Sequence, residues 1–538
     1  MSDVPGEQTP ERGTRRPDGS LEIRRHGIVS LTYEGGFVRQ YHTANKVGFF
    51  LGPVVFIILL LMPLPPGMKP EAQRVAAVTA LMAIWWITEA IPIPATSLLP
   101  IAMFPLLKIM PSKAATAPYA DHLIYLFMGG FFIAVTMERW NLHRRIALKT
   151  IKLVGVSPSR MIFGFMAATA FLSMWVSNTA TTMMMVPIGL AVIQQAFGFE
   201  GHDLKHGSGS GPEYNFGTAL MLGIAYAASI GGVATIIGTP PNVIMVAMIG
   251  KMYGQHIGFA QWMAFGVPLA LITLLVCWYL LTRILFPMGS LTLAGGEQII
   301  DHEIELLGPM KKEEKWIVAV GCFVGFCWIV RGFVKIPALS MVHDATIGIL
   351  GALILFALPT DFKNGKFLLD WKTAVKIPWD VILLFGGGLA IANGFTKTGL
   401  ADWIAGNLST LQGMAPVLFV MLVVAITIFM TELTSNTATA TLLIPIMGSA
   451  AVALGINPYA TIIGACVAAS FAFMLPVATP PNAVVFGSGC VSIGQMCKAG
   501  FWLNLFGIFI ITCMTFYLMP MLWGIDLSHL PAWAITPK

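Results

Sequence analysis

The sequence predicts an all-α integral membrane protein in which two inverted-topology repeats contain discontinuous helices. Three observations support this fold class. Hydrophobic residues make up 56% of the 538 residues and charged residues 11%, against about 25% charged residues in a typical soluble domain. The apolar residues gather in runs long enough to cross a bilayer, and two polar motifs each occur twice. A soluble protein of this composition would expose too much apolar surface to water.

Residues 1–45 precede the first apolar run and are polar, so a basic, disordered cytoplasmic tail is expected there. No aromatic interleaving accompanies its charges, which argues against binding of nucleic acid. No apolar core follows within the first 40 residues, which argues against a cleavable signal. The last residues, 526–538, are expected to form a short C-terminal tail. The basic residues up to position 46 are Arg12, Arg15, Arg16, Arg24, Arg25, Arg39 and Lys46.

The apolar runs predict about 11 transmembrane helices, because a span needs ~20 residues. Two further apolar segments, 155–195 and 412–450, are interrupted by polar residues and are predicted to be re-entrant helical hairpins. The first hairpin belongs to the first part of the membrane region, 46–300, and the second hairpin to the second part, 301–525. The predicted spans are 46–63, 74–92, 94–110, 122–140, 216–249, 259–286, 315–331, 343–358, 378–396, 457–490 and 501–523.

The Lys and Arg residues of the connections predict the orientation. If eleven segments cross and the two hairpins do not, the basic connections all fall on the side of the basic tail. Cytoplasmic loops carry the excess of Lys and Arg, so the N-terminus is predicted to be cytoplasmic and the C-terminus to lie outside. The marking residues are Arg139, Arg144, Arg145, Lys149, Lys152, Arg160, Lys311, Lys312, Lys315, Lys363, Lys366, Lys372, Lys376 and Lys498.

Polar motifs of the first half return in the second half. S-N-T-A-T stands at 177–181 and again 258 positions later, at 435–439. T-P-P-N stands at 239–242 and again 240 positions later, at 479–482. A polar loop, 198–215, explains the shorter second spacing, since its counterpart is far shorter. An odd number of predicted crossings separates equivalent segments, so the halves are inverted, as in secondary transporters with a site at mid-membrane.

The chemistry of these motifs favours a binding site. Hydroxyl and amide groups inside an apolar hairpin need partners, because burying them unpaired costs several kcal/mol. Helix ends leave N–H groups that attract anions and C=O groups that attract cations. Each Pro-Pro pair breaks its helix, so 216–249 and 457–490 are predicted to be broken helices. Polar residues that join helices, or a simple kink, are the structural alternatives.

None of the four motifs contains Arg, Lys or His. An anion would therefore be held by amides, hydroxyls and helix N-termini. A bound sodium ion would supply positive charge, since oxygen ligands suit hard cations. Glu432 adjoins the second S-N-T motif where the first repeat has Met174. Two interpretations of this intramembrane carboxylate stay open: it tunes a cation site or carries a proton, or it pairs with a donor of the scaffold.

The doubled S-N-T and P-P-N motifs, together with Glu89-Ala90-Ile91-Pro92, resemble the divalent anion/sodium symporter family, the INDY-like di- and tricarboxylate transporters. The resemblance covers roughly 45–525. It implies a homodimeric, multi-pass protein of the cell (inner or plasma) membrane that imports succinate-, malate- or fumarate-like anions, or citrate, with sodium. It also implies alternating access by an elevator movement, with no bound cofactor.

The resemblance also implies ligands at positions that match the family motifs. One sodium ion would be held by Ser173, Ser177, Asn178 and Gly238, and a second by Thr431, Ser435, Asn436 and Ala478. The carboxylate substrate would be held by Asn178, Thr179, Thr239, Asn436, Thr437 and Thr479.

Four other functions are weighed against sodium symport. A sodium-independent carboxylate exchanger or a sulfate symporter could share the fold. A membrane enzyme is not expected, because the sequence has no paired carboxylates, nucleophile with a His partner, zinc spacing or Gly-rich phosphate loop. A channel would need a continuous polar pore, whereas interrupted hairpins favour an occluded central site.

Overall fold

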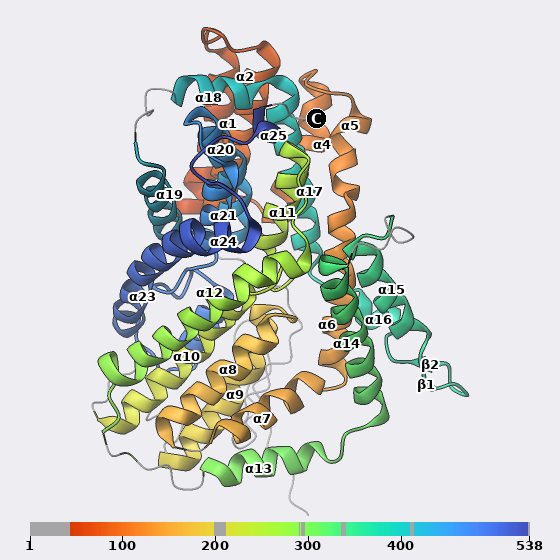
Figure 1. The fold of residues 1–538 in the computed structure, drawn as a ribbon, viewed down its shortest axis with the longest axis vertical. Coiled ribbons are helices and arrows are strands. Elements are labelled where there is room, and N and C mark those ends of the chain that lie inside the picture. Colours follow the sequence, from red (N-terminus) through yellow and green to blue (C-terminus); the bar gives the residue numbers. More distant parts are fainter. Residues whose placement is uncertain are drawn as a thin grey trace, which may run out of the picture. The chain divides into compact units, whose positions relative to one another are not determined.

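The computed structural model describes residues 43–155, 157–197, 211–289, 291, 296–334, 341–408 and 414–535. These parts are helices and their connections, apart from one antiparallel pair of short strands, β1 (Pro359–Asp361) and β2 (Lys366–Phe367). Figure 1 shows the helices coloured along the sequence. The predicted all-α class is confirmed. The predicted tail lies outside the described residues up to residue 42, and the predicted loop 198–215 lies outside them up to residue 210.

Prolines interrupt the first helices. The predicted span 94–110 forms two short helices, because Pro100 has no N–H to donate to the carbonyl of Thr96 and continue the first helix. Pro94 and Pro100 stand in the first turns of the two helices, and Pro105 lies inside the second. The preceding helix begins with a proline in its first turn, where no N–H is needed. This part contains α1 (Thr43–Leu61), α2 (Pro70–Thr88), α3 (Ile93–Thr96), α4 (Leu99–Leu106), α5 (Ser112–Thr116) and the 3-10 turn η1 (Ala117–Ala120).

The two repeats agree helix by helix. Three pairs of equivalent helices begin 258 positions apart, so the spacing found in the motifs extends to the helix boundaries. One of these pairs begins with a proline in both repeats. These three pairs are α7 (Leu142–Val154) with α18 (Leu400–Leu408), α8 (Pro158–Ser173) with α19 (Pro416–Thr431), and α9 (Asn178–Phe197) with α20 (Asn436–Ala453). A fourth pair, α6 (His122–Arg139) with α17 (Trp379–Thr398), begins 257 positions apart.

Both T-P-P-N motifs start the second half of a broken helix, as predicted. The first break, 234–239, separates α10 (Pro212–Val233) from α11 (Pro240–Tyr253), and the second, 470–479, separates α21 (Pro458–Ala469) from α22 (Pro480–Gly487). The residue before each Pro-Pro pair has the same extended φ of −142°. A proline at the first helical position has no N–H to leave unpaired, so each half-helix starts there.

The last helix of each repeat contains a π-helical turn. α12 (Phe259–Tyr279) continues through η3 (Leu280–Leu285), and α23 (Ile493–Cys513) continues through η6 (Met514–Leu518) into α24 (Met519–Trp523). Shorter or linking helices are α13 (Gly296–Leu307), α14 (Lys312–Phe333), α15 (Asp344–Ala357), α16 (Trp371–Ala374) and α25 (Ala532–Ile535).

Charged side chains join α7 to the link between the repeats. Arg145 and Glu314 are both buried, with Nε of Arg145 2.7 Å from Oε1 of Glu314. The same guanidinium donates to the carbonyl oxygen of Gly308 at 2.8 Å. Arg144 pairs with Glu303 at the same interface. The buried guanidinium and carboxylate therefore both have hydrogen-bond partners, as buried charges require.

Within the described residues, eight helices are long and apolar enough to cross a membrane, and four shorter apolar helices accompany them. The eight include α9 and α20, the second helices of the predicted re-entrant hairpins. The number of about 11 spans and the re-entrant course of the hairpins therefore stay predictions. The long candidates also include Thr43–Leu61, Ser112–Arg139, Pro212–Val233, Phe259–Leu285, Trp379–Thr398 and Ile493–Trp523.

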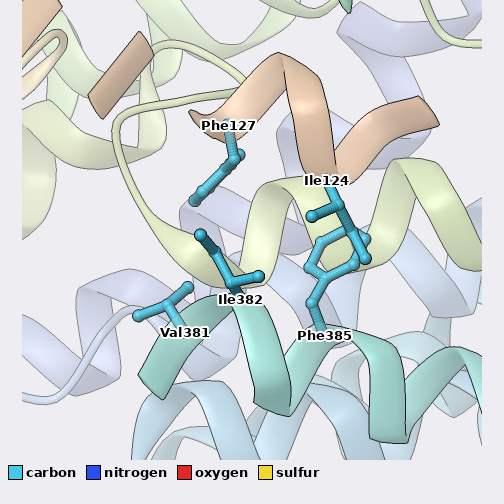
Figure 2. A pocket seen from close by; sticks show the side chains of 5 residues that line it. All are labelled: Ile124, Phe127, Val381, Ile382 and Phe385. Atoms are coloured by element: carbon cyan, nitrogen blue, oxygen red, sulfur yellow. The ribbon is translucent and has the colours of Figure 1, made fainter. Parts of the chain in front are cut away.

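Equivalent helices of the two repeats meet at α6 and α17. The rings of Phe127 and Phe385, 258 positions apart, have centroids 6.2 Å from each other. Figure 2 shows a small pocket between these helices, lined also by Ile124, Val381 and Ile382. Ile124 and Ile382 have the same spacing, so both repeats contribute the same positions. The lining side chains are hydrocarbon and offer no hydrogen-bond donor to an anion.

Candidate functional site

The tip of the first helical hairpin gathers oxygen atoms. Ser173 is the last residue of α8, is fully buried, and places its hydroxyl 2.5 Å from Oδ1 of Asn178, the first residue of α9. The same hydroxyl lies 2.7 Å from the carbonyl oxygen of Ala228 in α10. One hydroxyl hydrogen therefore serves two acceptors, so this point has more acceptors than donors.

The amide of Asn178 faces the same excess of acceptors. Its atom nearest Ser173 also lies 3.2 Å from the carbonyl oxygen of Ala228 and 3.3 Å from that of Gly238. Protein partners alone favour the NH₂ group in this position, because an amide oxygen there meets only acceptors. A cation at the same point would reverse the preference, since hard cations take oxygen ligands. The geometry brings three of the four residues predicted for the first sodium site together.

Gly238 leaves no space for a side chain at this cluster. A Cβ atom on Gly238 would lie 2.4 Å from the carbonyl oxygen of Gly232, and one on Gly232 would lie 2.7 Å from Oδ1 of Asn178. Glycine at both positions therefore allows the two sides of the break to approach each other and the amide.

The second hairpin repeats the hydroxyl–amide pair. Thr431 ends α19 and is buried, with its hydroxyl 2.8 Å from Oδ1 of Asn436 and 2.8 Å from the carbonyl oxygen of Ala469. Ala469 is the last residue of α21, as Ala228 lies near the end of α10. Ala478, predicted for the second sodium site, is buried in the second break. The two repeats thus form two similar oxygen clusters.

The remaining predicted residues lie at helix N-termini. Ser177 is exposed, and its hydroxyl accepts from the backbone N–H of Ala180 at 3.2 Å. The hydroxyl of Thr479 accepts from the N–H of Asn482 at 3.2 Å. Within the described residues, the side chains of Ser177 and Thr479 form no hydrogen bond with Asn178 or Asn436. Four more predicted site residues lie at N-caps or in the first turns of helices: Thr179, Thr239, Ser435 and Thr437.

The hairpin of each repeat packs against the broken helix of the other repeat. α9, which starts in the first S-N-T motif, contacts α22, which starts in the second T-P-P-N motif. In the same way α20 contacts α11 (Figure 1). Four motifs far apart in sequence therefore belong to one body of packed helices, with N-termini that favour negative charge.

The asparagine of each T-P-P-N motif braces its break, a role that the motif analysis did not assign. Nδ2 of Asn242 donates to the carbonyl oxygens of Val233 at 3.1 Å and Thr235 at 2.7 Å. Nδ2 of Asn482 donates to those of Ala472 at 3.1 Å and Leu475 at 3.0 Å. The sequence contained a clue to this role, since an asparagine stands in both copies of the motif. A broken helix leaves backbone carbonyl groups without partners, and an amide side chain can donate to them.

Comparison with known proteins decides the family. Residues 43–525 match the model of the sodium:sulfate symporter transmembrane region. The chain belongs to this sodium:sulfate symporter family. The predicted resemblance is therefore confirmed, and the chain is a multi-pass membrane transporter.

Curated relatives of this symporter-family chain are named sodium-dependent dicarboxylate transporter SdcS. The protein from Staphylococcus saprophyticus is 43% identical over 496 residues, covering 91% of this chain and 94% of the relative. The protein from Staphylococcus aureus strain MRSA252 is 42% identical over 495 residues, with the same shares covered.

Two solved structures share the fold of this family member. The YdaH transporter of Alcanivorax borkumensis has a TM-score of 0.53 and covers 84% of this chain and 99% of its own. MtrF of Neisseria gonorrhoeae has a TM-score of 0.52, with 89% and 96% covered. Both are 12% identical to this chain, so the likeness concerns the fold alone.

Glu432 of this symporter-family chain is paired with protein donors. Its carboxylate accepts three consecutive backbone N–H groups, of Phe473, Met474 and Leu475, at 2.7 to 3.1 Å. It also accepts from Nδ2 of Asn504 in α23 at 2.7 Å. The carboxylate therefore pairs with protein donors, as one of the two interpretations expects: it is 3% exposed and its acceptor positions are occupied. These contacts leave open whether its charge also acts on the neighbouring cation site.

Proposed function

We propose that this chain is a secondary active transporter that imports dicarboxylate anions together with sodium ions. The observation that carries the proposal is the pair of oxygen clusters at Ser173–Asn178 and Thr431–Asn436. Oxygen acceptors outnumber donors in the second cluster, and in the first cluster when the amide oxygen of Asn178 faces Ser173, and such a surplus suits a hard cation. The names of the SdcS relatives support sodium as the coupling ion and a dicarboxylate as the substrate.

In this proposal the first sodium ion is held by Ser173, Ser177, Asn178 and Gly238, and the second by Thr431, Ser435, Asn436 and Ala478. The two bound ions supply the positive charge that the motifs lack. The dicarboxylate is held by Asn178, Thr179, Thr239, Asn436, Thr437 and Thr479. The N-termini of α9 and α20 support this assignment, because free N–H groups in the first turn of a helix attract carboxylates. At α11 and α22, which begin with Pro-Pro pairs that lack N–H groups, the hydroxyls of Thr239 and Thr479 are the available donors.

The movement, assembly and orientation belong to the proposal as well. Substrate crosses by an elevator-type alternation of access, in a homodimer, and the chain lies in the cell membrane with its N-terminus cytoplasmic. The break of each central helix supports a site at mid-membrane, since unwound backbone there is tolerated beside protein or a polar cavity.

Uptake into proteoliposomes tests the proposal. Radiolabelled succinate is offered with an inward sodium gradient or with potassium alone, and unlabelled malate, citrate and sulfate are added as competitors. The expected result is uptake that needs sodium and is blocked by malate. Uptake without sodium that requires carboxylate inside would indicate an exchanger. Strong competition by sulfate, with weak succinate uptake, would indicate an inorganic-anion symporter.

Thr239→Ala tests which cargo this hydroxyl contacts. Thr239 is buried at the N-terminus of α11, where an anion is favoured. The variant is expected to raise the succinate concentration for half-maximal uptake about tenfold, the effect of one lost hydrogen bond to a charged group. The sodium concentration for half-maximal uptake should change less. The reverse ranking would assign Thr239 to an ion site.

A further inference from the structure

The second break differs from the first in the way its backbone is satisfied. In the first break, the hydroxyl of Thr235 donates to the carbonyl oxygen of Met174 at 2.6 Å and accepts from the N–H of Gly238 at 3.0 Å. In the second break, Leu475 stands 240 positions after Thr235 and has no hydroxyl. There the N–H of Ala478, the counterpart of Gly238, donates to the carbonyl oxygen of Leu475, and the carboxylate of Glu432 accepts the N–H groups of residues 473–475.

The partners of Glu432 are uncharged groups. In the part of the chain that the structure describes, no ion pair includes Glu432. Its recorded partners are three backbone N–H groups and the amide of Asn504, which together carry partial positive charge only. When it is ionised, a carboxylate with these partners carries a net negative charge in a medium of low dielectric, where charges act strongly on one another.

Glu432 is next in sequence to a residue of the second oxygen cluster. Glu432 follows Thr431, whose hydroxyl belongs to that cluster, and the segment that Glu432 holds leads to Ala478 and Thr479. The first cluster has Met174 in the equivalent position. The two clusters therefore contain similar oxygen atoms, but only the second is followed in sequence by a carboxylate, that of Glu432.

We propose that Glu432 is a positioning residue that makes the second cluster the stronger sodium site. Its hydrogen bonds hold the unwound segment 473–475 in place, and its negative charge attracts the ion. The first cluster, closed by neutral groups, binds sodium more weakly and fills second. This inference rests on the proposed function, because it concerns the ions that the transporter carries.

Sodium titration of the purified protein without substrate tests the inference separately from transport. The readout is the unfolding midpoint as a function of sodium at constant ionic strength, since a ligand of the folded state stabilises it. Wild type is expected to show stabilisation at a lower sodium concentration than Glu432→Gln, by about tenfold. Glu432→Asp, which keeps the charge, should recover part of the difference.

Met174→Gln is the matched control, because it places the same amide at the equivalent position of the first repeat. It is expected to leave the first stabilisation step unchanged. Glu432→Gln that folds and titrates like wild type would overturn the inference, and so would an equal shift in Met174→Gln.

A second variant keeps the test decisive if Glu432→Gln does not fold. Asn504→Ala removes one donor to the carboxylate and keeps the charge. A smaller shift in the same direction supports the inference, and an unchanged sodium midpoint overturns it. If wild-type uptake itself ignores sodium while the sodium titration behaves as expected, the proposed coupling fails and the site assignment of Glu432 stands.

Discussion

Serine in the first repeat and threonine in the second occupy the same structural position. Each is the buried last residue of the first hairpin helix, and each hydroxyl contacts the asparagine amide five residues later and an alanine carbonyl of another helix. The methyl group that distinguishes Ser173 from Thr431 is accommodated, so the hydroxyl oxygen is the shared requirement. An oxygen ligand retained under different packing indicates a role in binding.

Removal of either asparagine amide should nearly abolish uptake. Asn178→Ala or Asn436→Ala deletes the amide oxygen from an oxygen cluster and leaves the buried hydroxyl with one fewer partner. Succinate uptake in proteoliposomes is expected to fall at least about a hundredfold, as a loss of two or more charged hydrogen bonds implies. Asn364→Ala, in the exposed strand connection, serves as control. Near-normal uptake by both site variants would contradict the assignment.

An added methyl group should distinguish the two clusters. Gly238→Ala would place Cβ 2.4 Å from the carbonyl oxygen of Gly232, so the backbone must shift beside Asn178. We expect weaker sodium dependence and slower uptake, measured from sodium titrations of the rate. Ala478→Gly is the matched change in the second repeat, and it should have a small effect because it removes a methyl group without a clash. Equal behaviour of the two variants would contradict this account.

Side chains at the hairpin tips could be predicted because their pattern occurs twice. The carbonyl groups of Ala228 and Ala469 could not, because every residue has a carbonyl and the sequence does not mark those that face a site. The partners of Glu432 escaped prediction for the same reason, since backbone N–H groups supply most of them. Asn242 and Asn482 could have been predicted to matter, because the T-P-P-N motif occurs twice. Only the threonines of that motif, Thr239 and Thr479, were assigned a role from the sequence.

At the level of elements, the Pro-Pro pairs begin α11 and α22 as expected. The division of the predicted span 94–110 into α3 and α4, just before Pro100, was not expected. Hydropathy records apolar character in both cases and does not register where a helix must restart. The strand pair at 359–367 was also missed, although Asn364-Gly365 is a common hairpin turn and Gly365 has φ +63°.

The buried ion pair between α7 and α14 should stabilise the protein measurably when intact. Arg145→Met leaves Glu314 buried without its partner and frees two carbonyl acceptors, so about 3–5 kcal/mol of stability should be lost. The unfolding temperature in detergent measures this loss. The double variant with Glu314→Leu should be less destabilised than Arg145→Met alone. Additive losses would show that the two side chains act independently.

At the level of the whole molecule, the repeat explains most of what could be predicted. Helices α7 to α9 and α18 to α20 start at a constant offset of 258 residues, so one correctly interpreted half predicts the other. The number of crossings could not be settled in this way, because α9 and α20 are long enough to span a membrane and are also arms of the hairpins. Length and composition do not distinguish these cases.

Labelling from each side of the membrane tests the predicted orientation. Lys363 lies in the exposed turn between β1 and β2, and Ser528 is exposed beyond α24. In intact cells, a membrane-impermeant thiol reagent should modify Ser528→Cys and spare Lys363→Cys, which should react after the membrane is opened. Protein with its seven native cysteines gives the background. Labelling of both variants from outside would require a different number of crossings.

The hydroxyl of Ser173 has a further consequence for the transport cycle. Its oxygen already contacts the amide of Asn178 and the carbonyl of Ala228, so a sodium ion at the proposed site must take over contacts that the protein satisfies by itself. Thr431 does the same in the second repeat. Each cluster therefore contains its own competitor, and binding is an exchange of a hydrogen bond for an ion contact. This exchange lowers affinity and eases departure, which suits a protein that must give up its cargo in every cycle.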